Sequence, residues 1–147
     1  MNIDIKLYEG KLLEKFSIDQ IAGFLYAHLD EYGDRKNDIL KAIRYALGDN
    51  GKPGGFIVLA IHDGKIIGAV IINNTEMSGY IPEHILVYIA VNKEYRGEGI
   101  GKKLMRKTIN ACEGDIALHV EKDNPAKHLY EKLGFTNPYL EMRFKQS

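Results

Sequence analysis

A glycine-rich stretch in the second half of the chain has the residue types and the spacing of a phosphate-binding turn. Residues 91–103 read V-N-K-E-Y-R-G-E-G-I-G-K-K, after an apolar run and before a helical pattern. Glycines permit a sharp turn and bring backbone N–H groups close to a ligand, and a helix N-terminus attracts phosphate. Six basic residues and two acidic ones lie between Lys93 and Lys107, in a chain of zero net charge. The stretch therefore predicts an anion-binding loop.

The spacing of the glycines distinguishes between kinds of phosphate loop. A Walker loop requires G-x-x-x-x-G-K-[ST], but Gly97 and Gly101 are one residue too close and Lys103 occupies the Ser/Thr position. In a dinucleotide-binding G-x-G-x-x-G, Lys102 would replace the third glycine. The spacing that fits is R-x-x-G-x-G, which begins at Arg96. It resembles the acetyl-CoA pyrophosphate loop of the GCN5-related N-acetyltransferase (GNAT) family; a plain glycine-rich turn that caps a helix is the alternative.

A second stretch, residues 119–135, also resembles this family. The family commonly shows an asparagine, an alanine three residues on, a tyrosine four residues later, and then Gly-Phe. Asn124 lies one residue late for this pattern, and Asp123 holds the usual asparagine position. The residues that keep the register are Ala126, Tyr130, Gly134 and Phe135.

The resemblance implies acetyl-CoA as the cosubstrate and no metal. Free backbone groups near Ile89 and Val91 would pair with pantetheine, and amides from Gly97 to Lys102 would surround the pyrophosphate. The side chains of Arg96 and Lys102 either add positive charge or are solvated. The residues expected to bind the cofactor are Ile89, Val91, Arg96, Gly97, Glu98, Gly99, Ile100, Gly101, Lys102, Asn124, Ala126 and Tyr130.

Acetyl transfer from a thioester to an amine requires a proton donor for the departing thiolate. The resemblance assigns this role to Tyr130, because a phenol with a reference pKa of about 10 stays protonated at neutral pH. Tyr130 also lies at helical spacing from the apolar residues Ala126 and Leu133. Packing in the core is therefore the alternative interpretation.

A general base must accept a proton from the amine, whose reference pKa is about 10.4. Glu83 lies thirteen residues before Arg96, similar to the offset of the base glutamate in the histone-acetyltransferase branch of the family. The alternative is a solvated carboxylate at the start of a strand, and Glu121 and His84 are further candidates for the base. The spacing of the histidines matches no metal site.

The elements that position these residues predict an α/β fold with a central mixed sheet flanked by helices, which also resembles the GNAT order βααβββαβαβ. Ser17 and Gln20 form a capping box, Asp34 is expected to cap the second helix, and residues 62–64 read as a hairpin turn. The strand at 84–91 is apolar on both faces, with Leu86, Tyr88 and Ala90 on one of them, so it should lie centrally. The expected elements occupy residues 3–7, 18–32, 35–47, 56–61, 65–72, 84–91, 99–112, 115–120, 125–133 and 139–144.

Composition limits the classes of function. The 147 residues fit a single N-acetyltransferase domain over 1–147. Zero net charge argues against nucleic-acid binding, and no apolar run is long enough to cross a membrane. The single cysteine, Cys112, suits a reducing compartment. With no signal sequence at the N-terminus, we expect a cytoplasmic protein, a monomer or a homodimer.

The favoured function is that of an acetyl-CoA-dependent N-acetyltransferase, in which a primary amine attacks directly within a ternary complex. The acceptor is a small-molecule amine or a peptide or protein amine, and the sequence does not identify it. Asp30, Glu31 and Asp34 either attract a polycationic acceptor or are solvated. The alternatives to the enzyme are a non-catalytic CoA-binding or regulatory module of the same fold and, more weakly, a binder of nucleotide phosphates.

Overall fold

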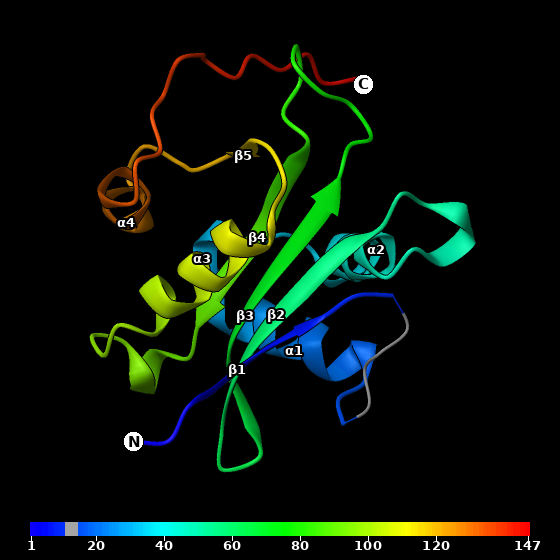
Figure 1. Ribbon diagram of the computed structural model, residues 1–147. Helices are drawn as coiled ribbons and strands as arrows, with labels where there is room; N and C mark the ends of the chain where they lie inside the picture. The colour runs from blue at the N-terminus through cyan, green and yellow to red at the C-terminus, as the bar shows by residue number, and fades with distance from the viewer. Residues whose placement is uncertain (11–14) are drawn as a thin grey trace.

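The computed structural model describes residues 1–10 and 15–147, which form a twisted five-stranded sheet with helices on both faces (Figure 1). The expected mixed α/β architecture is confirmed. Its main elements are β1 (Asp4–Tyr8), α1 (Ile18–His28), α2 (Lys36–Ala46), β2 (Gly55–His62), β3 (Lys65–Asn74), β4 (His84–Val91), α3 (Ile100–Ala111), β5 (Ile116–Leu118) and α4 (Ala126–Lys132). Short 3₁₀ turns η1 (Asp30–Tyr32), η2 (Asp49–Gly51) and η3 (Lys93–Tyr95) lie between them.

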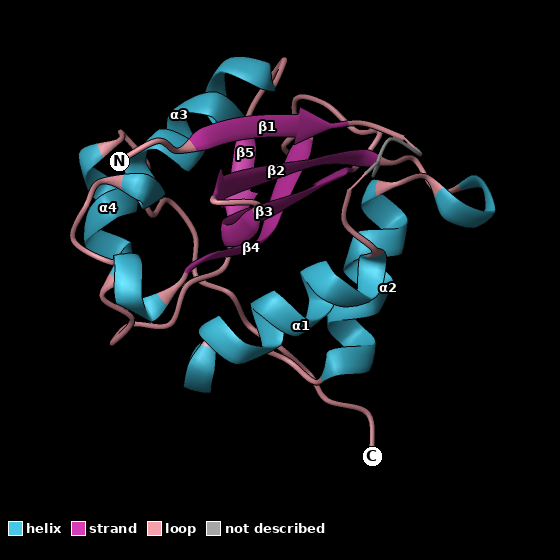
Figure 2. Cartoon of the chain, turned by 90° about the horizontal axis from the view of Figure 1, so that it is seen from below, coloured by secondary structure: helices cyan, strands magenta, loops and turns pink. Residues whose placement is uncertain are grey.

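The strands follow one another in the order β1-β2-β3-β4-β5. The first four are antiparallel neighbours, and β5 is parallel to β4. Helices α1 and α2 lie together on one face, and α3 and α4 lie on the other (Figure 2). A parallel pair requires a crossover connection, which is here the loop after β4 followed by α3. The predicted glycine-rich loop therefore lies at the end of β4.

Local sequence signals account for several element boundaries. The hairpin between β2 and β3 turns at Asp63 and Gly64, whose φ angles of 50° and 73° suit the tight turn that matches strand twist. The Ser17 side chain accepts a hydrogen bond from the Gln20 amide, and the Gln20 side chain accepts one from the Ser17 amide, so the expected capping box begins α1. Gly48 follows α2 with a left-handed φ of 78°, as predicted.

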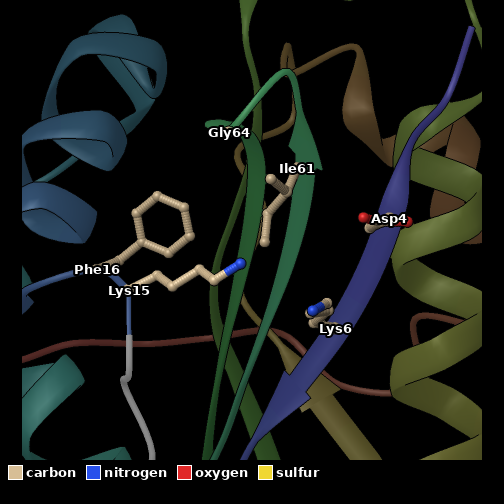
Figure 3. A pocket seen from close by; sticks show the side chains of 6 residues that line it. All are labelled: Asp4, Lys6, Lys15, Phe16, Ile61 and Gly64. Atoms are coloured by element: carbon tan, nitrogen blue, oxygen red, sulfur yellow. The ribbon is translucent and has the colours of Figure 1, made fainter.

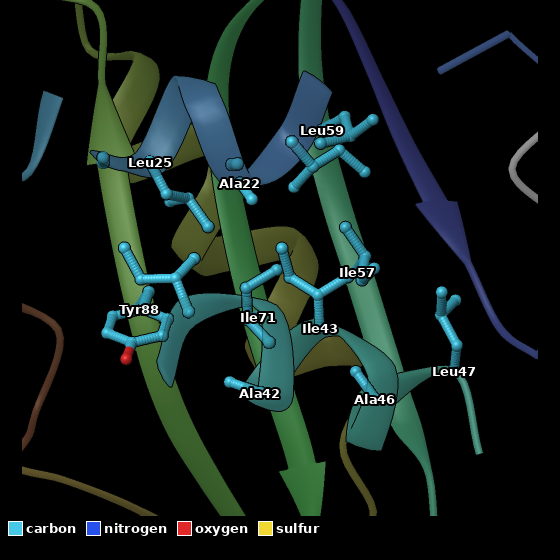
Figure 4. Packing of buried hydrophobic residues seen from close by; sticks show 14 residues of the cluster. Ala22, Leu25, Ala42, Ile43, Ala46, Leu47, Ile57, Leu59, Ile71 and Tyr88 are labelled. Carbon is cyan, nitrogen blue, oxygen red and sulfur yellow. The ribbon is translucent and has the colours of Figure 1, made fainter. Parts of the chain in front are cut away.

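Two apolar clusters fill the two sides of the sheet. The α1/α2 cluster is shown in Figure 4, where the labelled side chains converge between the helices and β2, β3 and β4. The cluster on the opposite side lies beneath α3 and α4 and includes Phe56, Val58, Val70, Ile72, Leu86, Ile100, Leu104, Met105 and Tyr130. As expected, β4 is an interior strand, between β3 and β5, and is covered on both faces.

A β-bulge interrupts the alternation along β4. Ile71 of β3 pairs with Tyr88, but the next residue, Ile72, pairs with Leu86, so Val87 is an extra residue in the strand. Such a bulge redirects the side chains beyond it. Leu86 therefore packs in the α3/α4 cluster and Tyr88 in the α1/α2 cluster. The expectation that they share a face was wrong, because simple alternation assumes an uninterrupted ladder.

Two other expectations are corrected. The last strand of the expected order is absent: residues 139–144 are irregular, because they form no ladder with a neighbouring strand. Asp34 does not cap α2, which begins after Arg35 without a side-chain cap. The Asp34 carboxylate instead accepts a 2.6 Å hydrogen bond from the Tyr88 hydroxyl.

Among the described residues, every helix is too short or too polar to span a bilayer.

Candidate active site

The two parallel strands, β4 and β5, stop pairing at the bulge at Val87. Beyond it a gap opens between them; this gap is the fork, and the two strands with the loops that follow them are its arms. β5 pairs with β4 only through His84, Ile85 and Leu86, whereas β4 continues to Val91. From Val87 onward, the β5 side of β4 has no partner strand among the described residues. The backbone of a central strand is thus available to an extended ligand at this one place.

The hydrogen-bond pattern shows which residues face the opening. The Asn92 amide donates to the Ile67 carbonyl of β3 at 2.8 Å. Backbone groups of alternate residues point to opposite sides of an antiparallel strand. Tyr88 and Ala90 therefore face β3, while the N–H and C=O groups of Ile89 and Val91 face the fork. The structure thus places the two predicted pantetheine-pairing residues on this edge, where the Val91 carbonyl also accepts a hydrogen bond from Arg96 Nε.

The glycine-rich loop ends at the N-terminus of α3 with its amides unused. Gly99 caps the helix, and the first loop-to-helix bond runs from the Lys103 amide to the Gly99 carbonyl. No backbone N–H of residues 97–102 donates to an acceptor within the described part of the chain. Gly97 and Gly99 have φ angles of 86° and 77°, which favour glycine. An added Cβ at either would meet no heavy atom within 4 Å.

Gly101 has a different role from the two glycines before it. Its φ is not left-handed, and an added Cβ would lie 3.3 Å from the Leu129 side chain and 3.9 Å from that of Val91. The absence of a side chain therefore lets α4 approach α3 closely. Only the amide of Gly101 is available to a ligand, and the same holds for Ile100, whose side chain is buried in the core.

The basic residues near the loop fall into two groups. Lys102, Lys103, Arg106 and Lys107 are exposed on α3; the first two lie in its first turn beside the free amides, and the other two lie further along the helix. Arg96 is also exposed, but it is tied to the backbone on both sides: its Nε donates to the Val91 carbonyl at 3.2 Å and its Nη2 to the His28 carbonyl at 3.0 Å.

Tyr130 lies on α4 with its ring in the α3/α4 cluster, 5.9 Å from the Phe135 ring between centroids. The residue is 7 % exposed. In the described part of the chain its hydroxyl has no hydrogen-bond partner, yet no fully buried side-chain polar atom lacks one. Solvent therefore reaches the hydroxyl. Burial, followed by the charge of Glu121, raises the pKa of Tyr130 to about 12, so the phenol remains a proton donor at neutral pH.

The candidate bases have different surroundings. Glu83 lies before the paired part of β4, where its Oε1 accepts a 3.4 Å hydrogen bond from the Asp115 amide. Four residues, or ~13 Å of strand, separate it from Val87 at the fork. Both ring nitrogens of His84 are within hydrogen-bonding distance of neighbours, 2.8 Å from Asn74 Oδ1 and 3.1 Å from the Glu113 carbonyl. Glu121 is exposed in the loop between β5 and α4.

Asn124 lies two residues before α4, the helix that carries Tyr130. Its Oδ1 accepts a 2.9 Å hydrogen bond from the Ala126 amide, so part of its hydrogen-bonding capacity is already used. The carbonyl of Asp123 accepts a 3.3 Å hydrogen bond from the Tyr32 hydroxyl. The β5–α4 loop is thereby connected to the segment between α1 and α2.

The sequence interpretation missed the contacts that residues on the α1 side make with the loop. His28 provides its carbonyl to Arg96 and its Nδ1 to the Lys93 amide, 3.4 Å away. The Asp30 carboxylate lies 2.6 Å from Lys93 Nζ, so it is paired within the chain. No local motif marks such contacts, because they join residues more than sixty positions apart.

A surface hollow lies away from this site (Figure 3). It lies beside β1 and the β2–β3 turn, at the edge of the sheet opposite β5, and it contains none of the predicted site residues. Its lining consists of Asp4, Lys6, Lys15, Phe16, Ile61 and Gly64. Within residues 1–10 and 15–147, no group of three or more His, Cys, Asp or Glu side chains could hold a metal ion.

The arrangement suits a ligand with two parts. Free amides, open space and positive charge at residues 97–102 fit a pyrophosphate. The free edge at Ile89 and Val91 fits an extended chain that contains amide groups. Tyr130, which packs on the α3/α4 side of the sheet, is a phenol that stays protonated at neutral pH and can serve as a proton donor. The residues present therefore fit coenzyme A with an acyl group.

Comparisons with known proteins agree with this geometry. The sequence is 34 % identical over 85 residues to N-alpha-acetyltransferase 30 of Schizosaccharomyces pombe, and the aligned part covers 54 % of this chain and 57 % of that protein. A second relative is the 5-NmdU N-acetyltransferase of Pseudomonas phage PaMx11, 36 % identical over 84 residues, covering 56 % of this chain and 58 % of that protein. The chain thus spans less than two thirds of these curated relatives.

Solved structures show the same fold. A ribosomal-protein-alanine N-acetyltransferase from Brucella melitensis biovar Abortus 2308 superposes with a TM-score of 0.68 at 16 % identity, covering 99 % of this chain and all of that one. The aminoglycoside N-acetyltransferase AAC(6')-Iy in complex with CoA gives 0.68 at 16 % identity, covering 99 % and 95 %. The sequence profile of the acetyltransferase (GNAT) family matches residues 15–135. The chain therefore belongs to the GNAT acetyltransferase family.

Proposed function

We propose that residues 1–147 form one catalytic domain that transfers an acetyl group from acetyl-CoA to a primary amine. The observation that carries this proposal is the run of unused amides at 97–102 beside the free edge of β4. Two curated relatives named as N-acetyltransferases and a structural neighbour in complex with CoA support it. The acceptor is a small-molecule amine or an amine of a peptide or protein.

The chain's residues divide the binding work. Amides of residues 97–102 hold the pyrophosphate, and Lys102 adds positive charge at the first turn of α3. Ile89 and Val91 pair with the pantetheine amides as a neighbouring strand would. Together these contacts place the thioester near the fork and fix its orientation toward the amine.

Acetyl-CoA supplies an activated acyl carbonyl in the form of a thioester. The amine nitrogen forms a bond to this carbonyl carbon while the carbon–sulfur bond breaks. Tyr130 donates its phenolic proton to the departing sulfur, and solvent restores that proton. The excess proton on the amine passes to a base. We propose that this base is Glu83, which receives the proton through a water relay. Glu121 is the competing candidate, because its charge raises the pKa of Tyr130.

Binding and transfer are tested separately. Purified protein is titrated with CoA in a calorimeter, and acetyl-CoA is then offered with polyamines, aminoglycosides or peptides with free N-termini while thiol release is followed. We expect CoA to bind, ATP not to bind, and at least one amine to be acetylated. Binding without an acetylated product on any amine would favour the non-catalytic module.

The loop itself is tested by one substitution. Gly99→Val places a branched side chain at a φ of 77°, beside the proposed pyrophosphate. We expect it to abolish the rise in melting temperature that CoA produces. Unchanged CoA binding by this variant would overturn the loop assignment.

A further inference from the structure

The three-residue turn η1, which follows α1, is bound to both arms of the fork. On the β4 side, Asp30 Oδ1 lies 2.6 Å from Lys93 Nζ and Asp30 Oδ2 lies 3.9 Å from Arg96 Nη2. On the β5 side, the Tyr32 hydroxyl donates to the Asp123 carbonyl at 3.3 Å. The turn therefore spans the gap between the loop after β4 and the loop after β5.

Arg96 makes the most extensive of these connections. Its guanidinium donates to the carbonyls of Val91 and His28, at 3.2 and 3.0 Å, and also approaches Asp30. A planar guanidinium can hold several acceptors in one fixed geometry, and hydrogen bonds from a charged donor are stronger than neutral ones. These contacts join the end of β4 to the end of α1.

The backbone at Asp30 is held in an uncommon conformation. Its φ is 55° although it is not a glycine, and such a conformation persists where the surrounding contacts maintain it. An exposed ion pair such as Lys93–Asp30 is weak by itself. The contact of Arg96 with the carbonyl of His28, the last residue of α1 before η1, therefore carries most of the attachment on this side, and Asp30 adds to it.

The position of η1 relates this attachment to the proposed reaction. On one face of the fork lie α3 and α4, with Tyr130 among their packed side chains. η1 follows α1, which covers the opposite face. An amine that approaches a thioester between β4 and β5 would come from the η1 side, because α4 occupies the other.

We propose that Arg96 and Asp30 are positioning residues, which form a bracket that fixes η1, and with it the acceptor side of the fork, to the glycine-rich loop. The acceptor role rests on the function proposed above. Arg96 then serves the acyl-CoA site through the backbone that it holds, and its side chain is not a pyrophosphate ligand. This assignment replaces the expectation of a cofactor contact by Arg96.

Hydrogen exchange in the ligand-free protein tests the bracket. The amides of Tyr32 and Gly33, which bond to the carbonyls of Leu29 and Asp30, report whether η1 is held. We expect Arg96→Met to accelerate their exchange at least about tenfold, since a lost attachment raises the population of locally open states. Arg106→Met is the control, because it removes the same charge from an exposed site on α3. Asp30→Asn should accelerate exchange more than its control Glu31→Gln.

CoA titration and transfer assays distinguish positioning from phosphate binding. We expect the Kd for CoA of Arg96→Met to stay within about threefold of that of Arg106→Met. In the transfer assay, with spermidine or an unblocked peptide as the amine, KM for the amine should rise about tenfold and KM for acetyl-CoA should stay unchanged. Arg96→Lys keeps the charge but not the planar donor geometry, so it should behave like Arg96→Met.

Two results would overturn the bracket: unchanged exchange in Arg96→Met, or a Kd for CoA at least about tenfold weaker than in Arg106→Met and restored by Arg96→Lys. Failure of the wild-type protein to bind CoA would instead overturn the proposed function, and the exchange measurement would still decide whether Arg96 and Asp30 hold η1.

Discussion

Tyr130 combines a buried ring with a hydroxyl that solvent reaches, so the packing and catalytic interpretations of this residue are compatible. The ring fills space beneath α3, and the hydroxyl has no described protein partner that would compete with a substrate. Because burial raises its pKa to about 12, the phenol does not lose its proton below that range. Alkaline loss of activity at pH 8–10 would therefore come from another group.

Replacing Tyr130 with phenylalanine removes one hydroxyl and retains the ring. We expect kcat to fall by roughly 10²–10⁴, while the melting temperature and the Kd for CoA change little at neutral pH. Turnover is measured by thiol release with a saturating amine. A variant that keeps its turnover per folded molecule would show that the tyrosine serves packing alone.

The two candidate bases are compared with matched substitutions, Glu83→Gln and Glu121→Gln. Loss of the true base should lower kcat/KM most at neutral pH, where the amine is protonated. The loss should shrink as pH approaches about 10, because the amine then deprotonates unaided. Profiles of kcat/KM against pH decide between them. If the profile of a variant runs parallel to that of the wild type, the residue replaced in that variant is not the base.

How far the sequence can predict this site depends on the range of each interaction. Gly97 and Gly99 were predictable, since their left-handed φ angles and open surroundings follow from a local spacing. The contacts of His28 with Arg96 and Lys93 were not, because they join distant segments and depend on how α1 lies against β4. Charge and proximity in sequence left two interpretations of Asp30, attraction of a polycationic acceptor or solvation, whereas the fold pairs it with Lys93.

At the level of elements, β4 and α3 create the site together. The bulge at Val87 lies where β5 stops pairing, so the strand changes direction where a free edge is needed. Helix α3 must then bring the loop amides to the end of this edge. The two apolar faces of residues 84–91 predicted the strand but not its bulge, and the strand expected at residues 139–144 was predicted without specifying a neighbour for it.

Gly68 of β3 sets the approach of α3 to the sheet. An added Cβ would lie 2.8 Å from the Leu104 side chain, 3.3 Å from Ala60 and 3.4 Å from Ile100. We expect Gly68→Ala to destabilise the protein by about 1–3 kcal/mol through overpacking and to weaken CoA binding by displacing α3. Urea denaturation measures the first effect and calorimetry the second.

Gly23 provides the control for this substitution. It lies within α1, and an added Cβ there would meet no heavy atom within 4 Å. Gly23→Ala should therefore stabilise the protein by about 0.5–1 kcal/mol through helix propensity and leave CoA binding unchanged. Equal effects of the two substitutions would contradict the close approach of α3 at Gly68.

For the molecule as a whole, the two faces of the sheet each bury a tyrosine whose neutral form the fold favours. Burial is the main cause in both cases. Tyr130 has its pKa raised to about 12. The pKa of Tyr88 is raised further, and the hydrogen bond that it donates to Asp34 also contributes. The folded state thus depends on two phenols remaining protonated, one in each core.

This dependence predicts alkaline unfolding in a defined window. A group whose pKa is higher in the folded state stabilises that state below its unfolded pKa, and the stabilisation is lost as pH rises through the folded pKa. For Tyr130 the loss should begin near pH 10 and amount to about 2 kcal/mol by pH 12. Tyr130→Phe removes this ionisation, so urea denaturation should show a smaller fall in the unfolding free energy of this variant between pH 9 and 12 than in that of the wild type.

Tyr80→Phe is the control for this measurement. Since Tyr80 is 82 % exposed, this substitution should leave the profile of unfolding free energy against pH unchanged. If Tyr130→Phe and wild type lose stability in parallel, the hydroxyl ionises as freely in the folded protein as in the unfolded chain, and its placement in the α3/α4 core is wrong.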